Sequence, residues 1–185
     1  YNGLYAQRTN ILETLYSEAS IQLLNDTDKS QLKKHLEDLY ENLGAQLKKI
    51  GLNQSILIDR ISQLTYSAKT KNPDNLRTKF IIRMLYEIKA AYPTDASIEH
   101  IENESSEKAY TLNIGNLFPL EQTINSRIPK DATFKQKTEN YYSESVYYIV
   151  SEFLNKHYNK WSEDEITDRA IDLAKLFIDN YFKDL

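Results

Sequence analysis

This sequence of 185 residues contains no cysteine and only four glycines, four prolines and three histidines. The absence of cysteine excludes disulfides and thiolate metal sites, so that any metal would be bound through oxygen and nitrogen, which favours Mg²⁺ or Mn²⁺ over structural zinc. Among the four glycines no glycine-rich phosphate loop occurs. No apolar run approaches the roughly 20 residues needed to cross a bilayer, and residues 1–20 mix polar and apolar side chains unlike a signal peptide. We therefore expect a cytoplasmic protein without a membrane partner.

The composition, with 41% hydrophobic and 27% charged residues, is that of one ordinary domain, or of one domain with a helical appendage. Because the chain begins with Tyr1 instead of Met, we expect it to be a portion of a longer protein.

The net charge of −4 is unevenly distributed along the chain. Residues 1–94 carry 13 basic and 10 acidic side chains, whereas residues 95–185 carry 10 and 17. An acidic second half argues against a simple nucleic-acid-binding surface. Two basic clusters could still contact phosphates, or could equally lie on solvated helix faces; they are Lys69, Lys71, Arg77, Lys79, Arg83 and Lys89 in the first half, and Arg127, Lys130, Lys135 and Lys137 in the second.

Apolar residues at spacings of three and four predict four helices in residues 1–94. The clearest runs from Leu32 to Ile50 and is followed by Gly51, a residue suited to a left-handed helix cap. Another is expected to begin at Asn72-Pro73, with Asn as the cap and Pro in the first turn. These helices predict a helical bundle for the first half.

The periodicity changes at residues 91–95, which predicts a boundary between a helical subdomain, 1–94, and a second subdomain, 95–185. Residues 97–101 and 110–113 are expected to form the two strands of a hairpin. A short helix should start at Pro119, a helix or helix pair should cover 133–158, and a capping box at residues 162–165 should start the last helix. The predicted fold is mainly α with a small β-hairpin.

Three polar positions in the second subdomain suggest phosphodiester hydrolysis. Glu99 and His100 end the first predicted strand, where a carboxylate can hold a divalent cation and an imidazole can deprotonate water. Asn116 follows in a turn, and Asn125 follows nine residues later on a predicted helix, where its side-chain oxygen can ligate a hard cation.

The order Ile98-Glu99-His100-Ile101, Ile114-Gly115-Asn116-Leu117 and Asn125 resembles the HNH, or ββα-metal, nucleases. With the downstream segments Phe134–Lys137, Tyr141–Ser145, Trp161, Ile166–Arg169 and Leu173-Ala174, it more narrowly resembles the HNH domain of GmrSD-type restriction enzymes and of the related phosphorothioate-sensing Ssp nickase. The resemblance implies that His100 is the general base, that Glu99 and Asn125 bind Mg²⁺ or Mn²⁺, and that Asn116 braces the hairpin loop. It implies a ββα-metal motif beside the helical bundle.

By the same resemblance the chain would be a DNA endonuclease, nicking one strand or acting as a homo-oligomer, in restriction or anti-phage defence. An N-terminal nucleotide-hydrolysing sensor domain of the same protein would be its partner. Phosphates would meet Arg127, Lys130, Lys135 and Lys137 beside the site. The alternative is a catalytically inactive HNH-like module that docks a partner or binds DNA, because Glu102-Asn103-Glu104 replaces the proline and glutamine that usually follow the His-Ile pair.

Overall fold

The structure, a computed structural model, describes residues 53–104 and 108–182, together with five separate helical positions, Lys34, Glu37, Asp38, Glu41 and Ala45. The chain divides into two compact units, Tyr1–Asn53 with Asp184–Leu185, and Gln54–Lys183. Apart from those five positions, the helices predicted before Asn53 lie outside the described residues. The predicted boundary at residues 94 and 95 lies within the second unit.

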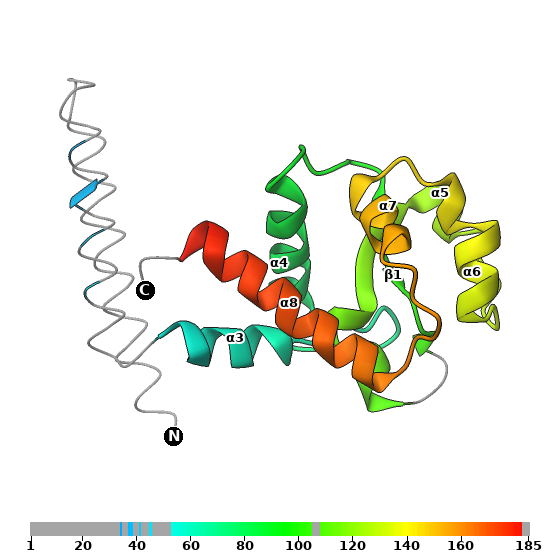
Figure 1. The fold of residues 1–185 in the computed structure, drawn as a ribbon, viewed down its shortest axis with the longest axis horizontal. Coiled ribbons are helices and arrows are strands. Elements are labelled where there is room, and N and C mark those ends of the chain that lie inside the picture. The colour runs from blue at the N-terminus through cyan, green and yellow to red at the C-terminus, as the bar shows by residue number, and fades with distance from the viewer. Residues whose placement is uncertain are drawn as a thin grey trace. The chain divides into compact units, whose positions relative to one another are not determined.

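The second unit is mainly helical with one small antiparallel sheet, as predicted (Figure 1). Its elements are α3 (Gln54–Ser62), α4 (Asn75–Glu87), β1 (Ala96–His100), the short 3₁₀ turns η2 (Ala109–Leu112) and η3 (Ile114–Asn116), β2 (Leu117–Glu121), α5 (Gln122–Asn125), α6 (Phe134–Asn140), the 3₁₀ turn η4 (Tyr142–Glu144), α7 (Tyr148–Asn155) and α8 (Glu163–Tyr181). None of the described helices is long and apolar enough to cross a membrane.

The second strand of the hairpin lies later in the chain than predicted. Residues 109–112 form the turn η2, and β2 instead pairs with β1 so that His100 faces Leu117 and Ile98 faces Pro119. The backbone N–H of Ile101 donates to the carbonyl oxygen of Asn116, and that of Gln122 donates to the carbonyl oxygen of Asp95. In an antiparallel sheet hydrogen-bonded pairs alternate with non-hydrogen-bonded pairs, so these two bonds show which pairs of the sheet are bonded. The Ile98–Pro119 pair falls between bonded pairs, so the missing N–H of proline removes no bond from the sheet.

Helix α5 also begins later than predicted, at Gln122 instead of Pro119, because residues 117–121 are held in the sheet. Helix α4 likewise begins at Asn75, not at Pro73. The side-chain oxygen of Asn72 accepts the N–H of Asp74 at 2.9 Å, and its carbonyl accepts the N–H of Asn75, so Asn72 closes a turn that precedes the helix.

Helix α8 packs against α3, α4 and η3 and organises the core (Figure 1). Its predicted capping box is confirmed, because the carboxylate of Glu165 accepts the backbone N–H of Ser162 at 2.9 Å. A Cβ on Gly115 would lie 1.9 Å from the carbonyl oxygen of Ile166, so only glycine lets η3 approach α8 this closely. This contact fixes the turn that immediately precedes β2.

The buried apolar residues form two clusters on either side of the sheet. One joins β2 to α7 and the segment before α8, and consists of Tyr86, Ile101, Phe118, Leu120, Ile124, Tyr142, Tyr147, Val150, Phe153, Trp161 and Ile166. The other joins α3, α4 and α8, and consists of Ile61, Ile81, Ile82, Leu85, Ile114, Leu117, Ala170, Ala174, Phe177 and Ile178. The strands are thus packed against both, which holds the end of β1 rigidly.

Candidate active site

His100 is buried at the end of β1, and its ring is oriented by the backbone of a distant residue. Its Nε2 lies 3.1 Å from the carbonyl oxygen of Tyr66, and the two rings stack with centroids 5.8 Å apart. A carbonyl only accepts, so Nε2 is the donor and Nδ1 of the neutral ring keeps its lone pair. Burial lowers the pKa of His100 below its usual value. Burial thus favours the neutral imidazole, and the bond to Tyr66 leaves Nδ1 as the atom that can accept a proton.

Glu99 lies next to His100 and is paired with a buried cation. Its Oε1 accepts hydrogen bonds from Nζ of Lys137 at 2.7 Å and from the hydroxyl of Tyr142 at 2.8 Å. Nζ of Lys137 also donates to the carbonyl oxygen of His100 at 2.6 Å. Burial and the neighbouring Glu99 carboxylate raise the pKa of Tyr142 well above its usual value, so its hydroxyl remains a donor. Oε2 of Glu99 has no hydrogen bond with any described residue.

Asn125, at the end of α5, is fixed by the same strand. Its Nδ2 donates to Oγ of Ser97 at 2.8 Å and lies 3.4 Å from the carbonyl oxygen of Ile98. Because the amide nitrogen faces the strand, Oδ1 is left to meet other groups. A pocket of about 180 Å³ brings this residue together with Glu99 and His100; it is also lined by Lys69, Asn103, Glu104, Ile128, Pro129, Lys130 and Lys137.

Asn116 does not line this pocket but is fully buried behind it. Its Oδ1 accepts the N–H of Glu102 at 2.8 Å and the indole N–H of Trp161 at 2.9 Å. Its Nδ2 donates to the carbonyl oxygens of Glu102 and Thr111 at 2.8 and 2.7 Å. All four hydrogen-bonding positions of the amide are therefore used to hold together the backbone at Glu102, the backbone at Thr111 and the indole of Trp161.

The oxygens around the pocket suit a hard divalent cation. The donor set consists of one carboxylate oxygen of Glu99 and the amide oxygen of Asn125, both of the type that Mg²⁺ and Mn²⁺ prefer. The described residues include no group of three or more histidine, cysteine or acidic side chains that could hold a metal. A cation at this position would thus complete its coordination with water and phosphate oxygens, as Mg²⁺ commonly does.

The structure changes the interpretation of Lys137. The sequence predicted a phosphate-binding surface residue, but the Lys137 side chain is only 2% exposed and is engaged by Glu99. A lysine within a Lys-rich stretch looks exposed in sequence, yet it lies on the inner face of α6.

The other residues predicted to bind phosphate lie at the surface. Arg127 is paired with Glu144 at 2.6 Å, and Lys135 lies 3.8 Å from Glu139. Lys130 lines the pocket itself. Arg127 and Lys135 thus have acidic neighbours, and the binding of all three residues to DNA stays a prediction.

The segment that departs from the family pattern is well held. Nδ2 of Asn103 donates to the carbonyl oxygen of Ala132 at 2.8 Å, and both backbone groups of Glu102 are bound by the side chain of Asn116. The loss of the usual proline is therefore accompanied by side-chain bonds that fix the same stretch of backbone.

Tyr66 and Tyr142 complete the site, but the sequence alone did not single them out for it. Their partners, His100 and Glu99, are 34 and 43 residues away in the chain. Such long-range contacts leave no periodic signal. In the sequence, the segments that contain Lys137 and Tyr142 stood out only because they resemble segments of the GmrSD-type HNH domain.

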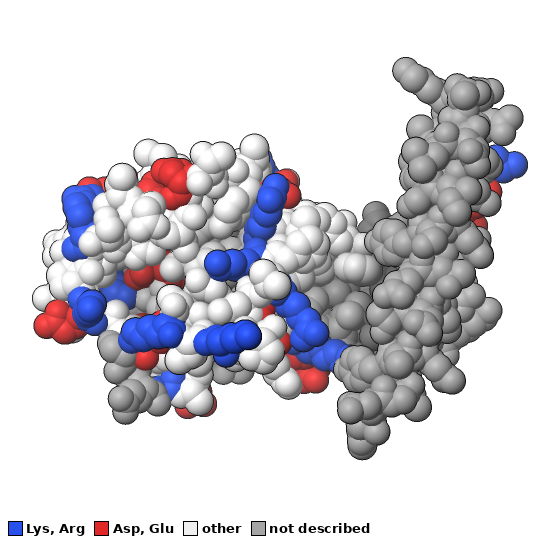
Figure 2. Space-filling view, turned by 180° about the vertical axis from the view of Figure 1, so that it is seen from behind, with Lys and Arg blue, Asp and Glu red and all other residues white. Residues whose placement is uncertain are grey.

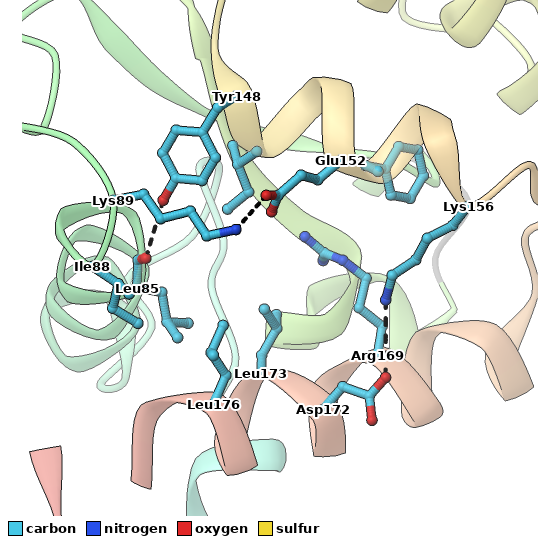
Figure 3. A pocket seen from close by; sticks show the side chains of 12 residues that line it. Leu85, Ile88, Lys89, Tyr148, Glu152, Lys156, Arg169, Asp172, Leu173 and Leu176 are labelled. Atoms are coloured by element: carbon cyan, nitrogen blue, oxygen red, sulfur yellow. Dashed lines mark hydrogen bonds and ion pairs between the residues drawn. The ribbon is translucent and has the colours of Figure 1, made fainter. Parts of the chain in front are cut away.

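A second hollow, of about 140 Å³, lies between α4, α7 and α8 (Figure 3). Its floor contains the buried Arg169, whose guanidinium donates to the carbonyl oxygens of Gly115 and Leu117 at 2.5 and 2.9 Å. Ion pairs of Lys89 with Glu152 and of Lys156 with Asp172 lie at its rim (Figure 3). None of the predicted site residues lines it, and Arg169 is accounted for by holding η3 and β2 against α8.

Basic side chains gather on one face of the molecule despite the negative net charge. Figure 2 shows lysine and arginine side chains in a row across that face, with acidic side chains mostly around them. The negative net charge of the whole chain therefore does not exclude a basic surface on this face.

The chain is similar to a known family over most of its length. The sequence model of the C-terminal domain of GmrSD restriction endonucleases matches residues 26–176. No curated protein and no solved structure matches the chain. The match covers both the helices before β1 and the segment that carries Glu99, His100, Asn116 and Asn125. The chain therefore belongs to the family of GmrSD restriction endonuclease C-terminal domains.

Proposed function

We propose that this domain is a metal-dependent HNH endonuclease that nicks DNA and acts as the effector of a restriction or anti-phage defence protein. The observation that carries the proposal is the meeting of three groups at one pocket: the neutral ring of His100, the free carboxylate oxygen of Glu99 and the amide oxygen of Asn125.

His100 performs the proton transfer in the proposed reaction. Nδ1 takes a proton from a water molecule, whose oxygen attacks the phosphorus as the bond to the 3′ oxygen breaks on the opposite side. The leaving oxygen then takes a proton from solvent. The carbonyl of Tyr66 keeps the ring in the tautomer that makes Nδ1 the base, and burial, which lowers the pKa of His100, favours the uncharged ring.

Glu99 and Asn125 would hold Mg²⁺ or Mn²⁺, with the free oxygen of the carboxylate and the amide oxygen as ligands. The bound cation supplies electrostatic stabilisation of the charge that develops on the phosphate oxygens. Lys137 and Tyr142 orient the Glu99 carboxylate, and Ser97 orients the amide of Asn125. Asn116 acts behind the site by fixing the backbone that follows His100.

One such site cuts one strand, so a single domain nicks DNA and a homo-oligomer would be needed to cut both strands. We propose that an N-terminal nucleotide-hydrolysing sensor domain of the same protein directs this activity, as in GmrSD-type enzymes.

The competing function is a noncatalytic docking module. It is favoured by the acidic residues 95–185 and by Glu102-Asn103-Glu104 in place of the usual proline and glutamine. The two functions are separated by incubating the purified chain with supercoiled plasmid and Mg²⁺ or Mn²⁺, with EDTA as the control. The endonuclease converts the plasmid to the open-circular form only when metal is present. An unchanged plasmid under all metal conditions would support the docking module instead.

A further inference from the structure

The loop between α3 and α4 is held by hydrogen bonds from the side chains of Ser67 and Asn75. Ser67 is buried, and its Oγ accepts the backbone N–H groups of Lys69 and Thr70 at 3.2 and 3.0 Å. The side chain of Asn75 binds Ser67 from the other side, accepting its N–H and donating to its carbonyl oxygen, both at 2.9 Å. The backbone that carries Lys69 and Lys71 is thus fixed before any ligand arrives.

This loop forms one wall of the His100 pocket. Tyr66 immediately precedes it and contacts His100 through both its carbonyl oxygen and its ring. Lys69 lines the pocket with Glu99, His100 and Asn125. The hydroxyl of Ser67 donates to the carboxylate of Glu104, which lines the same pocket and ties the loop to the segment that follows His100. A phosphate bound beside His100 would therefore lie next to this loop.

The basic side chains of this loop and of the start of α4 differ in their partners from the basic side chains that follow β2. Lys69, Lys71 and Lys79 are exposed and form no ion pair with any described residue. Nζ of Lys79 lies 5.4 Å from the ring centroid of Tyr66, so this cation is held beside the ring that stacks on His100.

Among the basic residues after β2, Arg127 is paired with Glu144, Lys135 has Glu139 beside it and Lys137 is buried. A cation that is already paired has to give up its partner before it can bind a phosphate, whereas an unpaired one gains the full attraction. The ion pairs therefore favour Lys69, Lys71 and Lys79 over Arg127, Lys135 and Lys137 as residues that bind phosphate.

We propose that Lys69, Lys71 and Lys79 bind successive backbone phosphates of the DNA strand that enters the His100 pocket. The inference rests on the proposed function and adds the surface through which the substrate is held. These are contacts of ammonium groups with phosphates, so they contribute affinity without sequence preference.

The test is DNA affinity as a function of salt concentration, measured by fluorescence anisotropy with a labelled duplex without added metal. All proteins carry His100→Ala, so that no cleavage interferes. Lys69→Gln, Lys71→Gln and Lys79→Gln are combined in one variant, which keeps most of each aliphatic stem. The control combines Lys156→Gln, Lys160→Gln and Lys175→Gln, which removes the same charge at exposed positions that belong neither to the loop nor to the lining of the His100 pocket. Thermal unfolding of both variants verifies that the fold is retained.

The loop variant is expected to bind at least about tenfold more weakly at low salt, with a slope of log affinity against log salt that is flatter by about two to three units. The control should lose far less affinity and keep the slope. Equal losses in the two variants, or a larger loss in the control, would overturn the inference while leaving the nuclease proposal intact. Absence of DNA binding by the His100→Ala parent, together with a plasmid left uncut by the chain that retains His100, would instead remove the proposed function and this surface with it.

Discussion

Nζ of Lys137 lies 2.7 Å from Oε1 of Glu99, and both side chains are buried. The pair joins α6 to the end of β1. The positive charge of Lys137 stabilises the ionised form of the Glu99 carboxylate, which the proposed binding of a metal ion requires. The hydroxyl of Tyr142 adds a second hydrogen bond to the same oxygen. The carboxylate is thereby held with one oxygen bound to protein and the other left for a ligand.

Lys137→Met should destabilise the protein by about 3–5 kcal/mol, because it leaves the buried carboxylate of Glu99 without its partner. Chemical denaturation measures the change, and Lys135→Met, at a side chain 80% exposed, is the control and should change stability by about 0.5 kcal/mol or less. Adding Glu99→Gln to Lys137→Met should recover part of the loss, because the unpaired charge is then gone. Equal stabilities of the two single Lys variants would contradict the buried pair.

Burial lowers the pKa of His100, which predicts a pH-dependent stability. The unfolded chain binds a proton near pH 6.5 and the folded chain binds it only at lower pH, so acid favours unfolding. This contribution to stability is present above about pH 6.5 and is lost as the pH falls toward the folded pKa. The unfolding free energy of His100→Gln should therefore fall less between pH 7.5 and pH 5.5 than that of the parent. An identical pH dependence in the two proteins would show that His100 is not buried as a neutral ring.

Asn116→Ala should lower stability and activity together, because it leaves the N–H groups of Glu102 and Trp161 without their acceptor. We expect a loss of about 3 kcal/mol, measured by chemical denaturation. Asn140→Ala, at an exposed position, serves as the matched control. Loss of activity at unchanged stability would mean that Asn116 acts on the substrate and not as a brace.

Asn125→Ala should weaken Mn²⁺ binding by roughly tenfold or more in calorimetry, since the amide oxygen is lost as a ligand. Asn125→Asp keeps an oxygen at the same position and should retain more of the affinity, even though it gives up the bond to Ser97. If the Ala variant binds Mn²⁺ as tightly as the parent, the ligand is another residue.

The features predicted correctly from sequence are those determined by local patterns. Helix α8 has its capping box and apolar stripe within one continuous segment, and the Glu99-His100 pair ends a strand as expected. The position of β2 was predicted wrongly because Pro119 suggests the start of a helix. The sheet can accept a proline there only because Pro119 pairs with Ile98 at a position without backbone hydrogen bonds. That register is set by tertiary contacts and cannot be read from residues 117–121 alone.

The candidate site was predictable only in part for the same reason. Glu99, His100 and Asn125 stand in a recognisable order, and the fold brings them to one pocket. Tyr66 binds His100 through its backbone carbonyl, a group that every residue has, so the residue type does not reveal this contact. Lys137 lies in a lysine-rich stretch that is typical of exposed lysines, although its side chain is buried. Contacts between residues this far apart are decided by packing, which sequence spacing does not encode.

The central claim is that His100 is the general base of a nuclease site, and the rate of plasmid nicking by His100→Ala tests it most directly. His157→Asn is the matched control, because it changes another histidine and asparagine tolerates the positive φ of 50° at that position. Single-turnover nicking with Mn²⁺ should fall by about 10²–10⁴-fold in His100→Ala and stay near the parent rate in His157→Asn. A folded His100→Ala protein that nicks at the parent rate would contradict the account.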